Sequence, residues 1–171
     1  AGPASAQPGD DATRSTARNA ATEGLALFDR GKFAEALEKF DRADALVHAP
    51  TMGFMAAHCL EKLGRLVAAS ERYLAVTRIV LDDKAPGGQR EAVIDAGKAR
   101  EALLRRIPSV EITLEGATPG EAEITLDGVA VPAAMIGLAR DADPGLHKLV
   151  AKRGAEVVTR DFTLREGEKA R

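Results

Sequence analysis

Two segments of this chain match each other at a constant offset of 33 residues. The matched pairs are Leu27 and Leu60, Gly31 and Gly64, Ala36 and Ala69, and Phe40 and Tyr73. An internal period of this size is typical of helical repeat arrays, in which each unit is a pair of helices and neighbouring units bury a shared core. Because such arrays usually present a surface to a partner, the period indicates a binding role.

The bulk properties fit a soluble protein of one domain or two small ones. The chain has 171 residues and a net charge of −2, with acidic and basic residues interspersed, so nothing favours nucleic acid as a partner. No apolar run approaches the roughly 18 residues of a membrane span, so we expect no transmembrane segment. The single cysteine, Cys59, excludes an internal disulfide.

Apolar residues at 3- and 4-residue spacings predict five helices in the first part of the chain. Gly31 and Gly64 are expected to end helices, and Thr51 is a candidate cap that follows Pro50. The expected helices cover residues 11–30, 33–46, 51–63, 66–81 and 89–106.

At Ile107-Pro108 the apolar period changes from 3.6 to 2, which indicates half-buried strands. Asp127-Gly128 lies between two alternating runs and predicts a tight hairpin turn, because both of its central residues require positive φ. Helices and strands are segregated along the chain, so we predict an α+β protein of more than one domain. Its expected parts are a disordered segment at 1–10, a helical domain at 11–107 and a small antiparallel β-sandwich at 108–171.

The repeats resemble tetratricopeptide repeats, which are helix–turn–helix units of 34 residues. Gly24, Gly31, Ala36, Phe40 and Ala43 match the family's small and aromatic positions in the first unit. The second unit fills the same places with Ala57, Gly64, Ala69, Tyr73 and Val76. The consensus tryptophan and the terminal proline are missing, and the period is one residue short. The resemblance covers about residues 14–81 and implies that residues 89–106 form a capping helix; a generic helical bundle is the alternative.

The C-terminal region resembles the small PEGA-type β-domains of bacterial envelope proteins, and an unrelated β-sandwich is the alternative. The matching residues are Ile124–Val129, Pro144–His147, Arg153-Gly154 and Thr163–Glu168. The residues before Asp11 lack apolar periodicity, and Ala4-Ser5-Ala6 has the small-x-small pattern of a signal-peptidase site. Together these features lead us to expect an exported protein of the periplasm or cell envelope; a disordered linker is the other interpretation of the N-terminus.

The resemblance implies that the first helix of each repeat lines a concave binding face. In this sequence the corresponding residues are Arg18, Ala21, Leu25, Phe28 and Asp29, followed by Phe54, His58, Glu61 and Lys62. The two aromatic residues among charges suggest a groove for a protein or peptide segment. The alternative is that Phe28 and Phe54 pack against each other or under the N-terminal segment. Members that clamp a peptide carboxylate use asparagine where this chain has Thr22 and Met55, so we do not expect that specificity.

No cluster of residues suggests catalysis, a metal or a cofactor. His58 and Cys59 are adjacent on a helix and point about 100° apart, so they cannot chelate one ion together. His147 is expected to be a core or edge histidine that is hydrogen-bonded to backbone, and Cys59 an inert buried thiol. None of the serines lies in a nucleophile-elbow context.

These observations predict a non-enzymatic interaction adaptor of the bacterial cell envelope that binds a partner segment on its concave helical face. The β-domain would attach the protein to another envelope or cell-wall component. The alternative is a structural or cell-wall-associated protein in which the β-domain carries the binding and the helices oligomerise.

Overall fold

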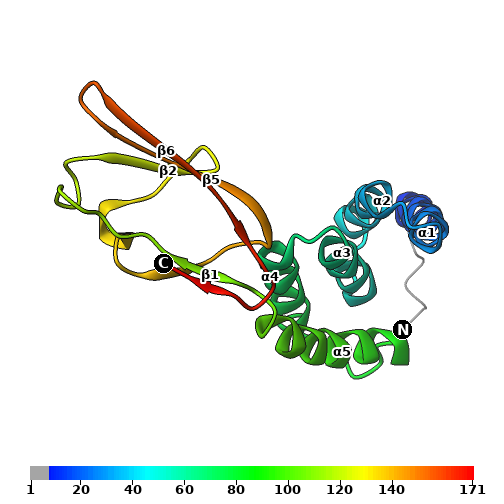
Figure 1. Cartoon of the computed structure of the whole chain (residues 1–171). Coiled ribbons are helices and arrows are strands. Elements are labelled where there is room, and N and C mark those ends of the chain that lie inside the picture. Colours follow the sequence, from blue (N-terminus) through cyan, green and yellow to red (C-terminus); the bar gives the residue numbers. More distant parts are fainter. Residues whose placement is uncertain (1–7) are drawn as a thin grey trace. The chain divides into compact units, whose positions relative to one another are not determined.

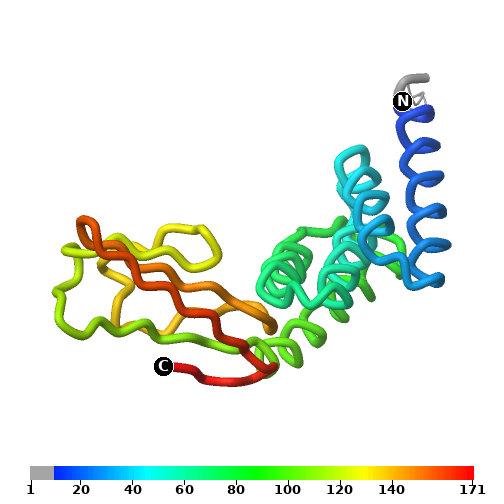
Figure 2. The backbone as a smooth tube through the Cα atoms, turned by 45° about the horizontal axis from the view of Figure 1, so that its top comes forward, coloured from blue at the N-terminus to red at the C-terminus, as the bar shows by residue number. Residues whose placement is uncertain are grey.

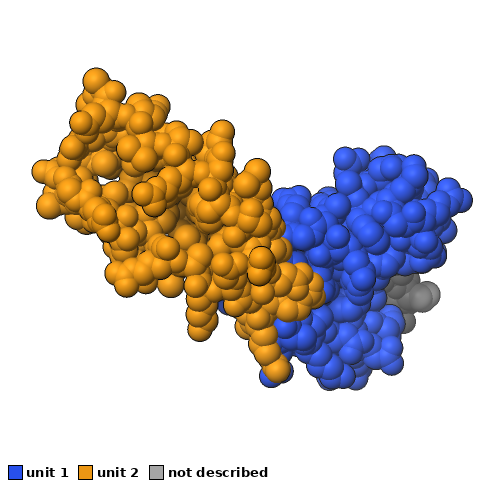
Figure 3. All heavy atoms as spheres, in the orientation of Figure 1, with its two compact units in different colours: residues 1–103 blue, residues 104–171 orange. Residues whose placement is uncertain are grey.

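A computed structural model describes residues 8–171, which form two compact units. Unit 1 comprises residues 1–103 and unit 2 comprises residues 104–171; Figure 3 colours them separately. The described residues of unit 1 are helical and those of unit 2 form two small sheets, so the protein has the α+β class expected from its sequence. The sequence-based boundary at residue 107 lies a few residues beyond this division.

Five helices occupy the described part of the chain before the sheets (Figure 1). They are α1 (Pro8–Asp29), α2 (Phe33–Leu46), α3 (Pro50–Lys62), α4 (Leu66–Thr77) and α5 (Gly87–Leu104). The bounds of α2 agree with those expected, whereas other helix ends differ by a few residues. Residues 1–7 of the segment expected to be disordered lie outside the described residues, and Pro8 to Asp10 belong to α1.

Two helix ends differ from expectation for identifiable reasons. Thr51 does not cap α3, because the helix begins one residue earlier at Pro50, and the fixed φ of proline suits the first helical position. Helix α4 was expected to reach Leu81 but ends at Thr77. The Thr77 hydroxyl donates a hydrogen bond of 2.7 Å to the Leu74 carbonyl, and such a bond competes with continuation of the helix.

The turns within the two helix pairs have the same geometry, at the same 33-residue offset. In each pair, a backbone N–H just after the turn donates a 3.0 Å bond to a carbonyl near the end of the first helix, from Lys32 to Leu27 and from Arg65 to Leu60. Each turn also contains one glycine with φ +74°, Gly31 or Gly64. This left-handed conformation is one that glycine adopts without strain. The sequence repeat is therefore also a repeat of backbone structure.

Small residues allow the helices of each pair to approach closely. A Cβ added to Gly24 would lie 3.0 Å from the Phe40 ring, and one added to Gly53 would lie 2.7 Å from Val76. The matched second-helix positions of the two repeats are all buried: Ala36, Phe40 and Ala43 on α2, and Ala69, Tyr73 and Val76 on α4. Arg72 on α4 adds ion pairs of 3.0 Å to Asp41 and Asp44 on α2.

Unit 2 contains two sheets that enclose an apolar core. One has the order β3 (Val129–Ala130), β2 (Glu123–Leu126), β5 (Gly145–Arg153) and β6 (Glu156–Leu164), with every neighbouring pair antiparallel. The other has the order β4 (Ala139–Asp141), β1 (Ser109–Glu111) and β7 (Lys169–Ala170). The core between them contains Val110, Ile112, Ile124, Leu126 and Leu164.

The smaller sheet contains two strands that the sequence pattern did not reveal. β4 lies in a segment without alternating apolar residues, and β7 lies in a terminal segment that is mostly polar. β7 pairs with β1 in parallel, with Ser109 opposite Lys169 and Val110 opposite Ala170. Figures 1 and 2 both show the C-terminal end of the chain lying beside β1. The predicted turn between β2 and β3 is present, with Asp127 at φ 53° and Gly128 at φ 80°.

The close packing at Ala36 predicts that enlarging this residue is costly. Ala36 is fully buried in contact with the Phe40 cluster, so Ala36→Leu should lower the free energy of unfolding by about 1–3 kcal/mol through overpacking. Ala34→Leu provides the matched control, because Ala34 is exposed on the same helix. Chemical denaturation measures both; equal effects at the two positions would show that Ala36 is not at a close contact.

The sequence-based boundary predicts that a fragment of residues 11–107 is helical by itself. Proline at 108 cannot continue a helix, and the helical core residues all come from unit 1. Far-UV circular dichroism and thermal unfolding of the fragment test this expectation. An unfolded fragment alongside a stable whole chain would mean that the helical segment requires residues 108–171.

Candidate functional site

The residues expected to form a binding face lie on α1 and α3. On α1, Arg18, Ala21, Leu25 and Phe28 follow one another at spacings of three, four and three residues, which places them on one side of the helix. Their α3 counterparts are Phe54, His58, Glu61 and Lys62. We call the combined surface the α1/α3 face.

A row of aromatic rings, each close to the next, runs along the α1/α3 face. The Phe28 ring lies 5.2 Å from the rings of both Phe33 and His58, edge-on in each case. His58 is 6.1 Å from Phe54, which in turn is 5.7 Å from the Tyr73 ring. Phe28 and Phe54 therefore do not stack directly on each other, because His58 lies between them. We call these five residues the aromatic row.

The aromatic row is partly embedded in the core and partly open to solvent. Tyr73 is fully buried, whereas Phe28, Phe54 and His58 are half-buried. Aromatic pairs in edge-on or tilted arrangements contribute about 0.5–1.5 kcal/mol beyond burial of their area. The exposed parts of Phe28 and Phe54 are thus fixed in position by the contacts of their buried parts.

Polar groups around the row are also held in place. The Tyr73 hydroxyl donates a 3.1 Å hydrogen bond to Glu61 Oε2, which orients this carboxylate. Burial lowers the pKa of His58, an effect that outweighs the opposing influence of Glu61, so the ring is neutral at pH 7. Asp29 and Lys62 are exposed at the last positions of α1 and α3.

At the opposite end of the α1 side, Arg18 and Ala21 line a hollow of about 260 Å³. Ten helical residues separate Arg18 from Phe28, a distance of about 15 Å along the axis. The hollow also involves residues that the predicted face did not include, among them Val47, Met52 and Gln89. Sequence spacing identifies the residues of one helix face, but gives no information about which residues of other helices lie beside it.

Leu25 connects the hollow to the aromatic row and is the most exposed apolar residue of the α1/α3 face. Leu25 comes between Ala21 and Phe28 on this side of α1, and 47% of the residue is accessible to solvent. Scattered exposed leucines are ordinary on protein surfaces. Leu25 differs because it precedes the half-buried Phe28 by three residues, which makes the two side chains neighbours on the surface of α1.

Other groups with reactive side chains are held in inert environments. Burial raises the pKa of the Cys59 thiol to about 11, so this residue is protonated at neutral pH. Within residues 8–171, no group of three or more histidine, cysteine, aspartate or glutamate residues is arranged to hold a metal ion. The described helices include none with the length and apolarity needed to cross a membrane.

Unit 2 contains a buried histidine that joins two turns. Asp127 Oδ2 lies 2.7 Å from His147 Nδ1, and the Asp143 carbonyl lies 2.7 Å from His147 Nε2. A carboxylate and a carbonyl both accept hydrogen bonds, so this arrangement favours the doubly protonated ring. Asp127 Oδ1 also accepts a 2.8 Å bond from the Lys148 N–H. The expected bond between His147 and backbone is therefore present, together with a carboxylate that sequence reasoning assigned only to a turn.

Comparison of the chain with protein families, curated proteins and solved structures found no match.

The contacts of His147 predict a pH-dependent stability of unit 2. Burial alone would lower the pKa of His147, but the bonds to Asp127 and Asp143 outweigh burial and raise it. A group whose pKa is raised by folding contributes its stability fully below its unfolded pKa of about 6.5, and that contribution is lost as pH rises through the folded value. The stability of unit 2 should therefore fall as the pH rises above about 6.5.

Asp127→Asn provides the matched variant, because asparagine keeps the shape of the side chain and tolerates positive φ. It should cost about 1 kcal/mol or more near pH 6 and flatten the pH dependence. Hydrogen exchange of the β5 and β6 amides at several pH values measures this stability. Replacing the exposed His48 with glutamine should leave the slope unchanged, and an equally steep slope in Asp127→Asn would contradict the assignment.

Proposed function

We propose that this protein is a non-enzymatic interaction adaptor of the bacterial cell envelope, related to tetratricopeptide-repeat proteins, that binds a partner segment on the α1/α3 face. The observation that carries the proposal is that three large apolar side chains of the α1/α3 face, Leu25, Phe28 and Phe54, are all partly or largely exposed. Aromatic side chains at such positions dominate interface energies, because they bury a large area at a small cost in conformational entropy.

The proposed mode of binding has an apolar centre and a charged rim. Leu25, Phe28 and Phe54 would contact apolar side chains of the partner. The exposed charges at Arg18, Asp29 and Lys62 would fix its orientation, since rim charges influence association rate and specificity more than affinity. Two repeats bury a limited area, so we expect affinity for an isolated peptide to be modest.

The proposal extends to the location of the protein and to the role of unit 2. The resemblance to PEGA-type domains and the small-x-small pattern at Ala4–Ala6 support export to the envelope. Unit 2 would then attach the adaptor to a second envelope component.

A second candidate function places the main binding site in unit 2. It is favoured by an open cleft between the two sheets, with a volume of about 630 Å³ in its larger part. In this alternative the protein is structural or associated with the cell wall, and the helices serve to oligomerise it.

The α1/α3 face predicts which substitutions weaken partner capture. Leu25→Ala and Phe54→Ala should each weaken capture from an envelope extract by about 2 kcal/mol, a typical loss at a binding hot spot. Leu25 is the cleaner site, because Phe54 also packs on Tyr73 and its loss could disturb the fold. Partners are identified by mass spectrometry, and circular dichroism confirms that helical content is unchanged.

Two substitutions serve as matched controls for this experiment. Leu46→Ala removes an exposed leucine from α2, outside the α1/α3 face, and Glu123→Ala changes an exposed residue of unit 2. Neither should affect capture. If capture survives both Leu25→Ala and Phe54→Ala but is lost on deleting residues 108–171, the alternative with binding in unit 2 is correct.

A further inference from the structure

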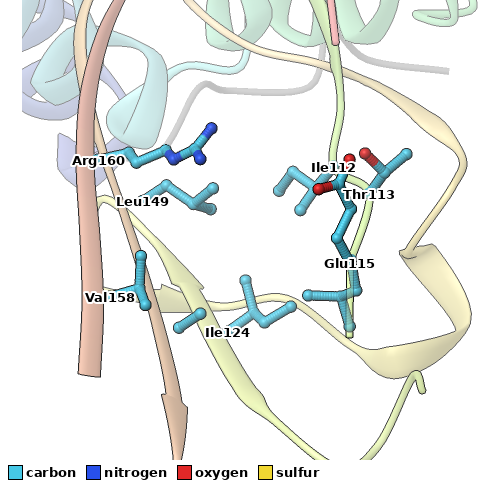
Figure 4. Close-up of a pocket in the computed structure, with 9 residues that line it drawn as sticks. Ile112, Thr113, Glu115, Ile124, Leu149, Val158 and Arg160 are labelled. Carbon is cyan, nitrogen blue, oxygen red and sulfur yellow. The ribbon is translucent and has the colours of Figure 1, made fainter. Parts of the chain in front are cut away.

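The cleft in unit 2 lies between the residues that follow β1 and the inner face of β5 and β6. It consists of two adjoining hollows of about 400 and 630 Å³ that share Ile112, Thr113, Glu115, Leu149 and Arg160. Figure 4 shows Arg160, Leu149 and Val158 on one wall, with Ile112, Thr113 and Glu115 across from them. We call this space the strand slot.

The slot exists because the two sheets differ in length. β5 and β6 pair over nine residues each, whereas β7 covers β1 over only two. Alternate residues of β6 face inward, because Phe162 and Arg160 lie opposite His147 and Leu149. Leu164, at the end near β7, is only 2% exposed, but Val158, at the far end, is 57% exposed. The inner face of β6 is thus uncovered where the smaller sheet stops.

One edge of the segment after β1 presents backbone groups toward the slot. The Ser109 N–H donates to the Glu168 carbonyl at 2.8 Å on the β7 side, and the Ile112 carbonyl accepts from Gly137 on the other side. Backbone groups alternate in direction along an extended chain, so those of Thr113 point to the β7 side, and the chain bends at Glu115. Among the described residues, Thr113 to Glu115 make no backbone–backbone hydrogen bond.

Contacts at both ends of the slot hold its walls in place. Near β7, the Gly167 N–H donates to the Arg106 carbonyl at 2.7 Å, and the Arg106 side chain forms an ion pair with Glu166. At the far end, Arg153 Nη1 donates a 2.8 Å bond to the Gly116 carbonyl. The slot is therefore framed by the fold itself.

We propose that the strand slot binds an extended segment of a partner protein, which pairs in parallel with residues 112–114 beyond Arg171, in the register set by β7. Ala170 faces the core opposite Val110, so partner residues opposite Ile112 and Leu114 would also face inward, under Phe162, Arg160 and Val158. This mode adds a strand to a sheet edge, with affinity from main-chain bonds and specificity from alternate side chains.

The charges of the slot specify one further property of the partner segment. Arg160 lines both hollows, and no ion pair or hydrogen bond of its guanidinium is present in the described part of the chain. Among the acids of the slot, Glu111 is paired with Arg171 at 3.5 Å, and Glu115 lines the same two hollows as Arg160 but forms no ion pair with it. An acidic side chain at an inward position of the partner would give Arg160 a counter-charge. The expected occupant is therefore an extended segment that alternates polar and apolar residues and carries one inward-facing acid.

This inference deepens the role proposed for unit 2 as the attachment to a second component, and it does not depend on the α1/α3 face. Leu25→Ala should leave binding in the strand slot unchanged. The two sites can therefore fail or succeed separately.

The test uses the full chain and the synthetic peptide acetyl-Thr-Val-Thr-Glu-Thr-Val-Thr-amide. We expect its binding, followed by amide NMR, to shift signals of residues 111–115 and 158–162. Methylating the amide nitrogens of the two valines removes donors directed at β1 and should weaken binding at least about tenfold. Methylating the threonine amides on either side of the glutamate provides the matched control, because these amides point away from β1.

Arg160→Gln tests the charge that specifies the partner. With the original chain, replacing the peptide glutamate by glutamine should weaken binding several-fold; with Arg160→Gln the two peptides should bind equally. Equal effects of the two methylation patterns, shifts confined to other residues, or absence of binding at millimolar peptide would each overturn the proposal.

A second protein variant identifies the source of the strand. The residues Val-Thr-Glu-Thr-Val-Thr are added directly after Arg171, and their hydrogen exchange is measured. If the added amides become protected while the free peptide does not bind, the slot accepts only a strand of the same chain, and docking of a partner is wrong. If the free peptide binds and the added strand blocks it, the intermolecular site is supported.

Discussion

Close approach of helices at positions without a side chain determines the geometry of unit 1. A Cβ on Gly24 would lie only 3.0 Å from the Phe40 ring, and a Cβ on Gly53 only 2.7 Å from Val76. Dense packing of this kind transmits small changes in volume, because protein interiors have few voids to absorb them. These contacts fix α1 on α2 and α3 on α4, and the Phe28 ring of α1 meets the His58 ring of α3 at 5.2 Å. The proposed binding face therefore depends on small residues that lie outside it.

Unit 2 depends on a different constraint, which is the unequal length of its sheets. A sandwich core is complete only where both sheets are present, and here one hairpin extends well past the short strands opposite it. The result is a gradient of burial along β6, from Leu164 in the core to Val158 in solvent. An uncovered inner face beside an unpaired strand edge is a template for another strand. The cleft is thus a consequence of topology rather than of any particular residue type.

The sequence predicted features that depend on local chemistry and missed those that depend on distant pairing. The offset of 33 residues identified both glycine turns, and Asp127-Gly128 identified the hairpin, because positive φ restricts residue choice locally. The start of α3 at Pro50 was missed, since a proline can either follow a helix or begin one. β7 was missed because its pairing with β1 joins residues far apart in the chain, in a polar segment. For the candidate site, the helix face could be inferred, but the position of His58 between Phe28 and Phe54 required the packing of α1 on α3.

The two proposed surfaces differ in the origin of their binding free energy. On the α1/α3 face the gain would come from burying Leu25 and the exposed ring surfaces, a term roughly proportional to area and insensitive to backbone chemistry. In the strand slot it would come mainly from backbone groups of the segment after β1, such as those of Thr113, which side-chain substitution leaves in place. Alanine scanning therefore reports on the first surface, whereas amide methylation of the ligand reports on the second. A partner that engaged both would bind more tightly than either segment alone, because the second contact becomes intramolecular once the first has formed.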